Sequence, residues 1–120
     1  MNNSRWMKAI FIDTKNKRVV EVEVMNYGAI RALINCDKIE GTYLDDNNEI
    51  YIDEEGIFNS ENEFFFMKDW AHPLAGNGVI LGFDAAAGLN KSHSANFQEI
   101  KENIVFMDKH DVRNWTLLNK

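Results

Sequence analysis

A short segment rich in glycine and aromatic residues, DWAHPLAGNG at positions 69–78, carries the side chains best suited to hold a small ligand. Successive backbone amides around a Gly-x-Gly pair can form a nest that binds anions such as phosphate. A nearby indole and imidazole could stack on a planar ring, and a carboxamide could hydrogen-bond its edge. The candidate ligand-binding residues are Trp70, His72, Gly76, Asn77 and Gly78. The alternative is a tight turn without a ligand, because Pro73 fixes one torsion and glycine tolerates positive φ.

A second candidate surface is the acidic segment at residues 39–67, which holds nine of the nineteen acidic residues and no lysine or arginine. The rest of the chain sums to +3, whereas the whole chain has a formal charge of −6. Such a segment is typical of a solvated hairpin, but it can also contact a cation or a basic protein, or mimic DNA phosphates. The residues that we place at a protein-interaction surface are Asp53, Glu54 and Glu55.

The other reactive residues form no recognisable catalytic or metal-binding pattern. Cys36 precedes Asp37, a setting that does not lower a thiol pKa, and the serines lie in no Gly-x-Ser-x-Gly elbow. The three histidines are far apart, and the calcium-loop-like residues 45–56 have isoleucine where the sharp turn needs glycine. We therefore expect a non-enzymatic protein with no catalytic residues, no metal and no cofactor.

The pattern of basic and apolar residues excludes two further classes of partner. Only Lys15, Lys17 and Arg18 are grouped, so we expect no direct binding of nucleic acid. No apolar run approaches the ~20 residues of a membrane span, and no targeting segment is visible. One cysteine allows no internal disulfide. We expect a soluble, cytoplasmic protein that does not bind membranes.

Hydrophobic periodicity predicts the elements that position the first half of the chain. Alternation predicts strands at residues 7–13 and 18–24, joined by a short hairpin turn. Apolar residues at helical spacing predict a helix over residues 27–34, capped by Asn26. Residues 38–53 predict a second hairpin, with turn-favouring residues at its tip.

The second half contains one ambiguous segment, residues 60–70. Ser60 and Glu63 fit the capping box of a helix, whereas FFFM at 64–67 is typical of a strand, the interpretation that we favour. Residues 79–83 predict a buried strand. A second capping box at Asn96 predicts an amphipathic helix that begins at residue 97. The residues VFM at 105–107 are either the end of this helix or a short final strand. The apolar tail after it is expected to dock.

Together these elements predict an α+β fold in a single domain over residues 7–120, with residues 1–6 as a flexible N-terminal extension. The expected architecture is a mainly antiparallel sheet of about five to six strands, with one or two short covering helices.

Several of these segments occur in a characteristic order. The aromatic strand FFFM is followed by a P-L-A-G-x-G loop at 73–78 and a V-I-L-G-x-D strand at 79–84, and then by a turn with Gly88 and the helix FQEIKENI. In this order, and in its opening MKAIFID, the chain resembles a family of small uncharacterised phage and mobile-element proteins over roughly residues 7–106. The resemblance implies no activity and no residue roles. It implies an accessory protein that interferes with host machinery, including antiviral defence.

From the residues and the resemblance together we expect a non-enzymatic accessory protein that neutralises a host antiviral defence factor by binding, for example by sequestering a nucleotide-derived signal. A chain of this size encloses a small ligand most easily at a subunit interface, so we expect a homo-oligomer. The alternative is an acidic protein–protein inhibitor or DNA mimic acting through residues 39–67. The expected partner is thus a nucleotide-like small molecule or a host defence protein.

Overall fold

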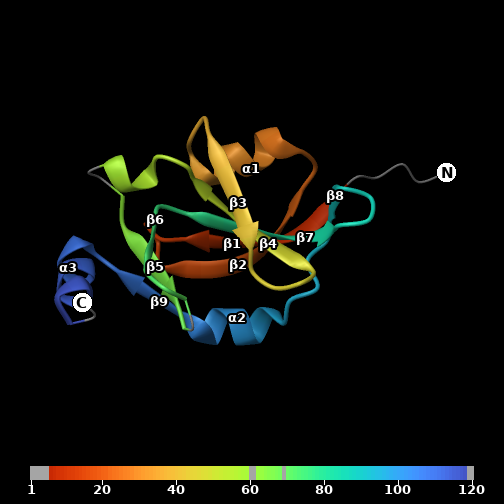
Figure 1. The fold of residues 1–120 in the computed structure, drawn as a ribbon. Helices are drawn as coiled ribbons and strands as arrows, with labels where there is room; N and C mark the ends of the chain where they lie inside the picture. Colours follow the sequence, from red (N-terminus) through yellow and green to blue (C-terminus); the bar gives the residue numbers. More distant parts are fainter. Residues whose placement is uncertain (1–5, 60–61, 69, 119–120) are drawn as a thin grey trace.

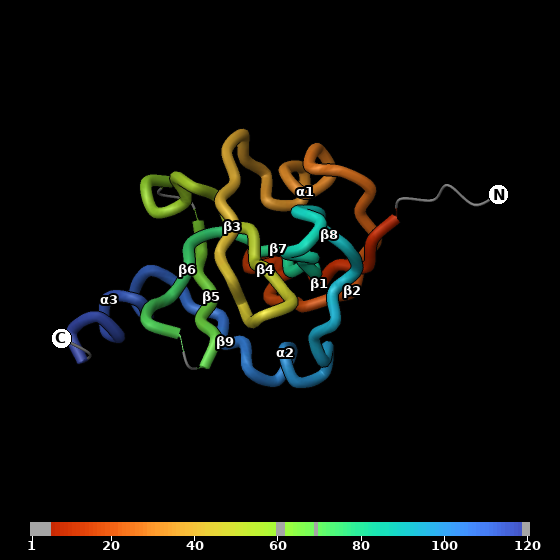
Figure 2. Tube along the Cα trace, turned by 45° about the vertical axis from the view of Figure 1, so that its right-hand side comes forward, coloured from red at the N-terminus to blue at the C-terminus, as the bar shows by residue number. Residues whose placement is uncertain are grey.

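The protein has three layers, seen in a computed structural model that describes residues 6–59, 62–68 and 70–118 (Figure 1). A central sheet, sheet A, has helix α1 on one face. A small second sheet, sheet B, and helix α2 cover the other face. Helix α3 lies at one end of the molecule, as Figure 2 shows from a second direction. The predicted α+β class and the mainly antiparallel sheet are confirmed.

Sheet A has the strand order β2-β1-β7-β4-β3, and β8 pairs with the end of β7. Each pairing is antiparallel. The strands are β1 (Met7–Asp13), β2 (Arg18–Val24), β3 (Ile39–Tyr43), β4 (Asn48–Asp53), β7 (Gly78–Asp84) and β8 (Leu89–Lys91). Both predicted hairpins, β1–β2 and β3–β4, are therefore present.

The central strands of sheet A are buried on both faces, because successive side chains of a strand point in opposite directions. Ile10 and Ile80 pack toward sheet B, whereas Phe11 and Val79 pack toward α1. This two-sided burial explains why the central strand β7 reads as a continuous apolar run rather than an alternating pattern.

Helix α1 (Tyr27–Ile34) begins and ends where its flanking asparagines predict. Asn26 Oδ1 accepts a hydrogen bond from the Ala29 amide at 2.9 Å, and Asn35 ends the helix with a left-handed backbone at φ 62°. Ile30 and Ile34 are buried against sheet A. These buried residues fix the orientation of the helix on the sheet. Its two ends therefore lie at different parts of the protein surface.

Sheet B resolves the ambiguous segment in favour of a strand. Its order is β6-β5-β9, formed by β5 (Phe64–Met67), β6 (Leu74–Ala75) and β9 (Ile104–Met107). Phe65 of β5 is fully buried, and a Cβ on Gly78 would lie 2.9 Å from its ring, so glycine is required there. Ser60, the alternative helix cap, lies outside the described residues.

Three α-helices are present in the described part of the chain, where one or two short covering helices were expected. Helix α2 (Phe97–Asn103) begins at Asn96, whose side chain accepts a hydrogen bond from the Glu99 amide as predicted. Helix α3 (Lys109–Leu118) was expected only as a docked tail, and Trp115 does pack on Phe66 with ring centroids 5.6 Å apart. No helix among the described residues combines the length and apolar character that crossing a membrane requires.

The β1–β2 turn is organised by a buried carboxylate, Asp13. Its oxygens accept hydrogen bonds from the Asn16 amide, from Asn16 Nδ2 and from Arg18 Nε, the last two at 2.8 and 2.9 Å. Burial alone would raise the pKa of Asp13, but the hydrogen bonds from Asn16 and Arg18 hold that pKa below its ordinary value. The ionised form therefore stabilises the fold.

We expect Asp13→Asn to lower the free energy of unfolding at pH 7 by about 2 kcal/mol, because it removes charge-assisted hydrogen bonds. Since the folded-state pKa of Asp13 is lowered, its contribution is complete above the unfolded pKa and disappears as the pH falls through the folded value. Urea unfolding of wild type and variant should therefore converge between pH 7 and pH 3. Glu23→Gln, an equal charge change on exposed β2, is the control. A difference that is independent of pH would contradict this role.

Candidate functional site

The Gly-Asn-Gly segment is built into the core rather than presented to solvent. Gly76 has φ 83°, and its amide donates to the Glu63 carbonyl oxygen at 2.7 Å. Gly78 is the buried first residue of β7, aligned with Ile12 of β1 and Ile52 of β4. The Gly76 amide is therefore already occupied, and the anion nest envisaged from the sequence is not open at this residue.

Asn77 connects three segments that are distant in sequence. Its Oδ1 accepts hydrogen bonds from the Thr14 amide and the Thr14 hydroxyl, both at 2.9 Å, and its Nδ2 donates to the Leu33 carbonyl oxygen at 3.1 Å. Thr14 is buried, so these bonds satisfy groups that water does not reach. The geometry supports a structural role for the Asn77 carboxamide, which anchors the β1–β2 turn and the end of α1.

The two ring-bearing candidates, Trp70 and His72, are placed differently from each other. Trp70 is half-buried and packs against the core between sheets A and B. His72 is exposed, and its Nδ1 lies 2.9 Å from the Pro73 carbonyl oxygen. His72 lines a hollow of about 190 Å³ with Asp53 and Glu54, whereas Trp70, Gly76, Asn77 and Gly78 are not among the residues of that hollow. The five candidates therefore do not share this hollow.

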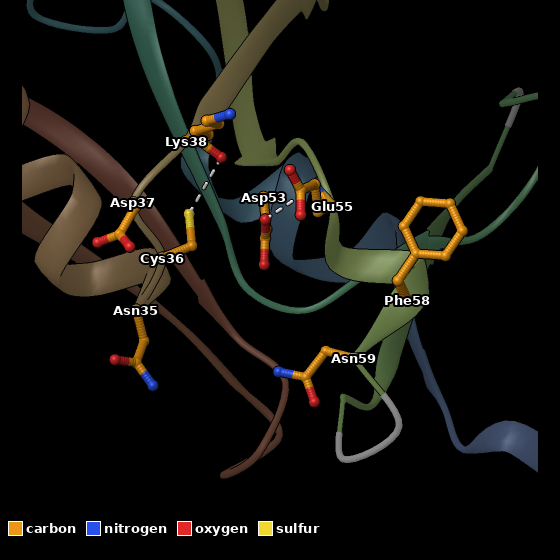
Figure 3. Close-up of a pocket in the computed structure, with 8 residues that line it drawn as sticks. All are labelled: Asn35, Cys36, Asp37, Lys38, Asp53, Glu55, Phe58 and Asn59. Carbon is orange, nitrogen blue, oxygen red and sulfur yellow. Dashed lines mark hydrogen bonds between the residues drawn. The ribbon is translucent and has the colours of Figure 1, made fainter.

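The acidic candidates, by contrast, lie together at the ends of β4 and α1. Asp53 lines both the hollow of His72 and a larger neighbouring hollow of about 460 Å³. Figure 3 shows Asp53 in this larger hollow, with Cys36 on one side and Phe58 on the other. Five acidic residues line the two hollows, and we call them the acidic face: Asp37, Glu40, Asp53, Glu54 and Glu55.

A short 3₁₀ helix, η1 (Gly56–Phe58), forms a ridge between the two hollows. Ile57 lines the smaller hollow and Phe58 the larger, and they are 73% and 83% exposed. The ridge is fixed from behind, because the Gly56 carbonyl oxygen accepts a hydrogen bond from Asn62 Nδ2 at 2.8 Å and Gly56 itself is buried. Two large apolar side chains are therefore held in water, among carboxylates, by an ordered backbone.

The thiol of Cys36 reports the electrostatics of this face. Burial and the negative charges of Asp53 and Asp37 raise its pKa to about 11. Its Sγ donates to the Lys38 carbonyl oxygen at 3.4 Å. At neutral pH the thiol is therefore protonated, which suits neither a nucleophile nor a metal ligand. A cation near Asp53 would lower this pKa.

One further group of potential metal ligands lies at the start of α3, where Asp108, His110 and Asp111 have ligand atoms within 4.8 Å of one another. All three are exposed, and the carboxylates of Asp108 and Asp111 each accept a hydrogen bond from the other residue's backbone amide. The hydrogen bond from the Asp111 backbone amide to the Asp108 carboxylate holds the pKa of Asp108 below its ordinary value. The arrangement is that of a helix cap, which explains it without an ion.

The sequence analysis named Asp53, Glu54 and Glu55 as candidates and placed Glu40 in the acidic segment, but it did not include Asp37, Ile57 or Phe58. A signal was present, since these two large apolar residues follow the DEEG turn directly, at a point where a turn normally carries polar residues.

Comparison with known families gives one match, which is described as "Domain of unknown function (DUF3846)" and spans residues 7–104. No match to the chain was found among curated proteins or solved structures. The match covers sheet A, α1, β5, β6 and α2, and it ends at Ile104, the first residue of β9.

Replacing Asn77 with alanine is expected to destabilise the fold by about 2 kcal/mol, because the amide and hydroxyl of buried Thr14 lose their acceptor. His72→Ala, on the exposed part of the same loop, should change stability by less than about 0.5 kcal/mol. Thermal and urea unfolding of the two variants measure this contrast. Equal stability of Asn77→Ala and wild type would show that the carboxamide is available for another purpose.

Neutralising Asp53 should lower the pKa of Cys36 from about 11 toward its ordinary value. In Asp53→Asn we expect alkylation of Cys36 by iodoacetamide at pH 8.5 to be about threefold faster or more, since half a pKa unit triples the thiolate fraction. Asp84→Asn, at the far end of β7, is the matched charge control. An unchanged rate in Asp53→Asn would mean that the face lacks the inferred negative potential.

Proposed function

The chain belongs to the DUF3846 family, and we propose that it is a binding protein that attaches to a basic partner protein through the η1 ridge and the acidic face. The observation that carries this proposal is the exposure of Ile57 and Phe58 between two hollows lined by five carboxylates. Isolated exposed apolar residues are ordinary on protein surfaces. Two adjacent ones on a fixed ridge, with a hollow on each side, have the form of an interface anchor.

The energetics of such a contact divide between the two kinds of residue. Burying an exposed Ile or Phe side chain contributes about 1.5–3 kcal/mol each, so the ridge supplies much of the affinity. The surrounding carboxylates attract a basic surface and orient it, which raises the association rate more than the affinity. Lys38 is the one basic residue in the described lining of the larger hollow, where acidic residues outnumber it.

The partner implied by this chemistry has lysine or arginine residues around an apolar socket. That corresponds to the acidic inhibitor or DNA mimic, rather than to sequestration of a nucleotide at residues 69–78. The internal hydrogen bonds of Gly76 and Asn77 are the reason for this order of preference. A DNA-binding partner and a basic partner of another kind are separated by competition with duplex DNA, which displaces the protein only from the former.

In its biological setting, we propose a phage or mobile-element accessory protein that acts in the cytoplasm of the host cell and neutralises an antiviral defence factor. Support for this setting comes from the P-L-A-G-x-G loop at 73–78 followed by the V-I-L-G-x-D strand at 79–84, the features that carry the resemblance to such proteins. The family match itself assigns no activity.

The proposal is tested by quantitative co-purification from host cells with paired variants. Phe58→Ser removes the apolar anchor, and Asp53→Asn combined with Glu54→Gln and Glu55→Gln removes charge without changing shape. A true partner should be depleted about tenfold or more by Phe58→Ser, since an anchor residue is worth about 2 kcal/mol or more. The charge variant should deplete it by a smaller factor, because exposed carboxylates contribute mainly to the association rate. Its binding to wild type should weaken as salt rises, because salt screens exposed charges.

The matched control is the triple variant Glu23→Gln, Glu99→Gln and Glu102→Gln, which removes the same charge from exposed positions outside the acidic face. Partners that bind the control, the Phe58→Ser variant and the acidic-face variant equally would contradict the proposal. If only His72→Ala and Trp70→Ala deplete the partner, the binding site is instead the 69–78 loop.

A further inference from the structure

A separate groove of about 680 Å³ lies at the other end of α1, where the start of β1, the β2–α1 junction and β8 meet. Figure 2 shows these three segments together at one end of the molecule, with η1 toward the opposite end. The groove walls include Trp6, Met25, Tyr27, Leu89 and Lys91, which we call the aromatic groove. Trp6, the only described residue of the extension expected at residues 1–6, lines the groove.

The walls of the aromatic groove are large apolar side chains that remain open to solvent. Trp6 and Tyr27 are each 53% exposed and Leu89 is 65% exposed, and Met25 is exposed as well. These four residues come from three separate segments of the chain, so their convergence is a property of the fold. The volume lies within the ~300–1,000 Å³ typical of small-molecule sites.

The phenol of Tyr27 is positioned by an ordered network beneath it. Its ring meets Tyr51 edge-on, with centroids 5.9 Å apart and planes at 88°. The Tyr51 hydroxyl donates to Glu49 Oε2 at 2.8 Å and lies 3.0 Å from Asn90 Oδ1. Asn90 Nδ2 in turn donates to the Gly82 carbonyl oxygen at 3.1 Å. One wall of the groove is thus preorganised, which reduces the entropic cost of binding a rigid ring.

The charge of the groove differs from that of the rest of the protein. No described residue that lines it is acidic, although the chain has nineteen acids and a net charge of −6. Lys91 is the one charged residue in the described lining of the groove, and the first turn of α1, residues 27–30, is uncharged. A ligand that enters this groove therefore meets aromatic faces and a cation, and avoids the repulsion that an anion would meet at the acidic face.

We propose that the aromatic groove binds a small aromatic anion, in which a planar ring carries a phosphate or a carboxylate. The ring packs against the indole of Trp6 and the phenol of Tyr27, and the anionic group lies toward the ammonium of Lys91. This site is independent of the acidic face, so the protein has one surface for a protein partner and another for a small ligand. It also offers the nucleotide-like partner expected from the sequence a site outside the 69–78 loop.

The test is a ¹⁵N NMR titration of the full chain with three probes: adenosine 5′-monophosphate, adenosine and indole-3-acetate. We expect saturable shifts of the Trp6 indole N–H and of backbone amides in residues 25–30 and 88–92. A response to the monophosphate alone identifies a nucleotide-type ligand, and a response to indole-3-acetate identifies an aromatic carboxylate. Adenosine should bind about fivefold more weakly than the monophosphate or not at all, because it lacks the charge that Lys91 recognises.

Variants separate this site from the acidic face. Lys91→Gln should weaken binding of the charged probes about fivefold and leave adenosine unchanged. Trp6→Ser should abolish binding of the responding probe, whereas Phe58→Ser should preserve it. Phe58→Ser is expected to lose the protein partner but to keep the small ligand. The two proposals can therefore be tested independently, and each can fail without the other.

Three outcomes of the titration would overturn the inference. They are no saturable shift with any probe at millimolar concentration, shifts that centre on residues away from the groove, or equal binding of charged and uncharged probes. A concentration-dependent dimer in sedimentation equilibrium that Trp6→Ser converts to monomer would also overturn it, because a second copy of the chain would then be the occupant.

Discussion

Strand β7 is the constraint on which the rest of the structure depends. It pairs with β1 on one side and β4 on the other, and its far end pairs with β8. Two glycines make this crowding possible. Gly78 leaves room for the ring of Phe65. Gly82 leaves room for the Ser92 carbonyl oxygen, with which a Cβ would collide, at the point where β8 replaces β1 as the neighbour of β7. Because β4 leads into the acidic face and β8 borders the aromatic groove, both candidate sites inherit their geometry from this one strand.

Helix α1 separates the two candidate sites. Its last turn is followed by Asn35, Cys36 and Asp37, which line the larger acidic hollow, and its first residues line the aromatic groove. The helix is fixed to the sheet by Ile30 and Ile34 and tied to the loop before β7 by Asn77. The acidic face, proposed to bind a basic protein, and the aromatic groove, proposed to bind an aromatic anion, therefore lie at opposite ends of α1. The two ligands would not compete for space.

The sequence predicts the features of this structure that depend on interactions between neighbouring residues better than those that depend on residues far apart in the chain. Local signals were reliable: Asn26 and Asn96 cap their helices, and the aromatic run at 64–67 forms a strand. The short strands β6 and β8 were not predicted, because they exist only through their partners. The role of Asn77 was equally hidden, since Thr14 and Leu33 are 63 and 44 positions away. Helix α3 could have been found, because Asp108 and Asp111 have capping-box spacing.

We propose that a protein partner binds at the η1 ridge and the acidic face. Hydrogen–deuterium exchange of the chain with and without its co-purified partner tests it most directly, since amide protection maps the contact without any substitution. We expect slower exchange confined to peptides that span residues 53–59 and the segment after α1. Protection of residues 69–78, with residues 53–59 unchanged, would contradict it.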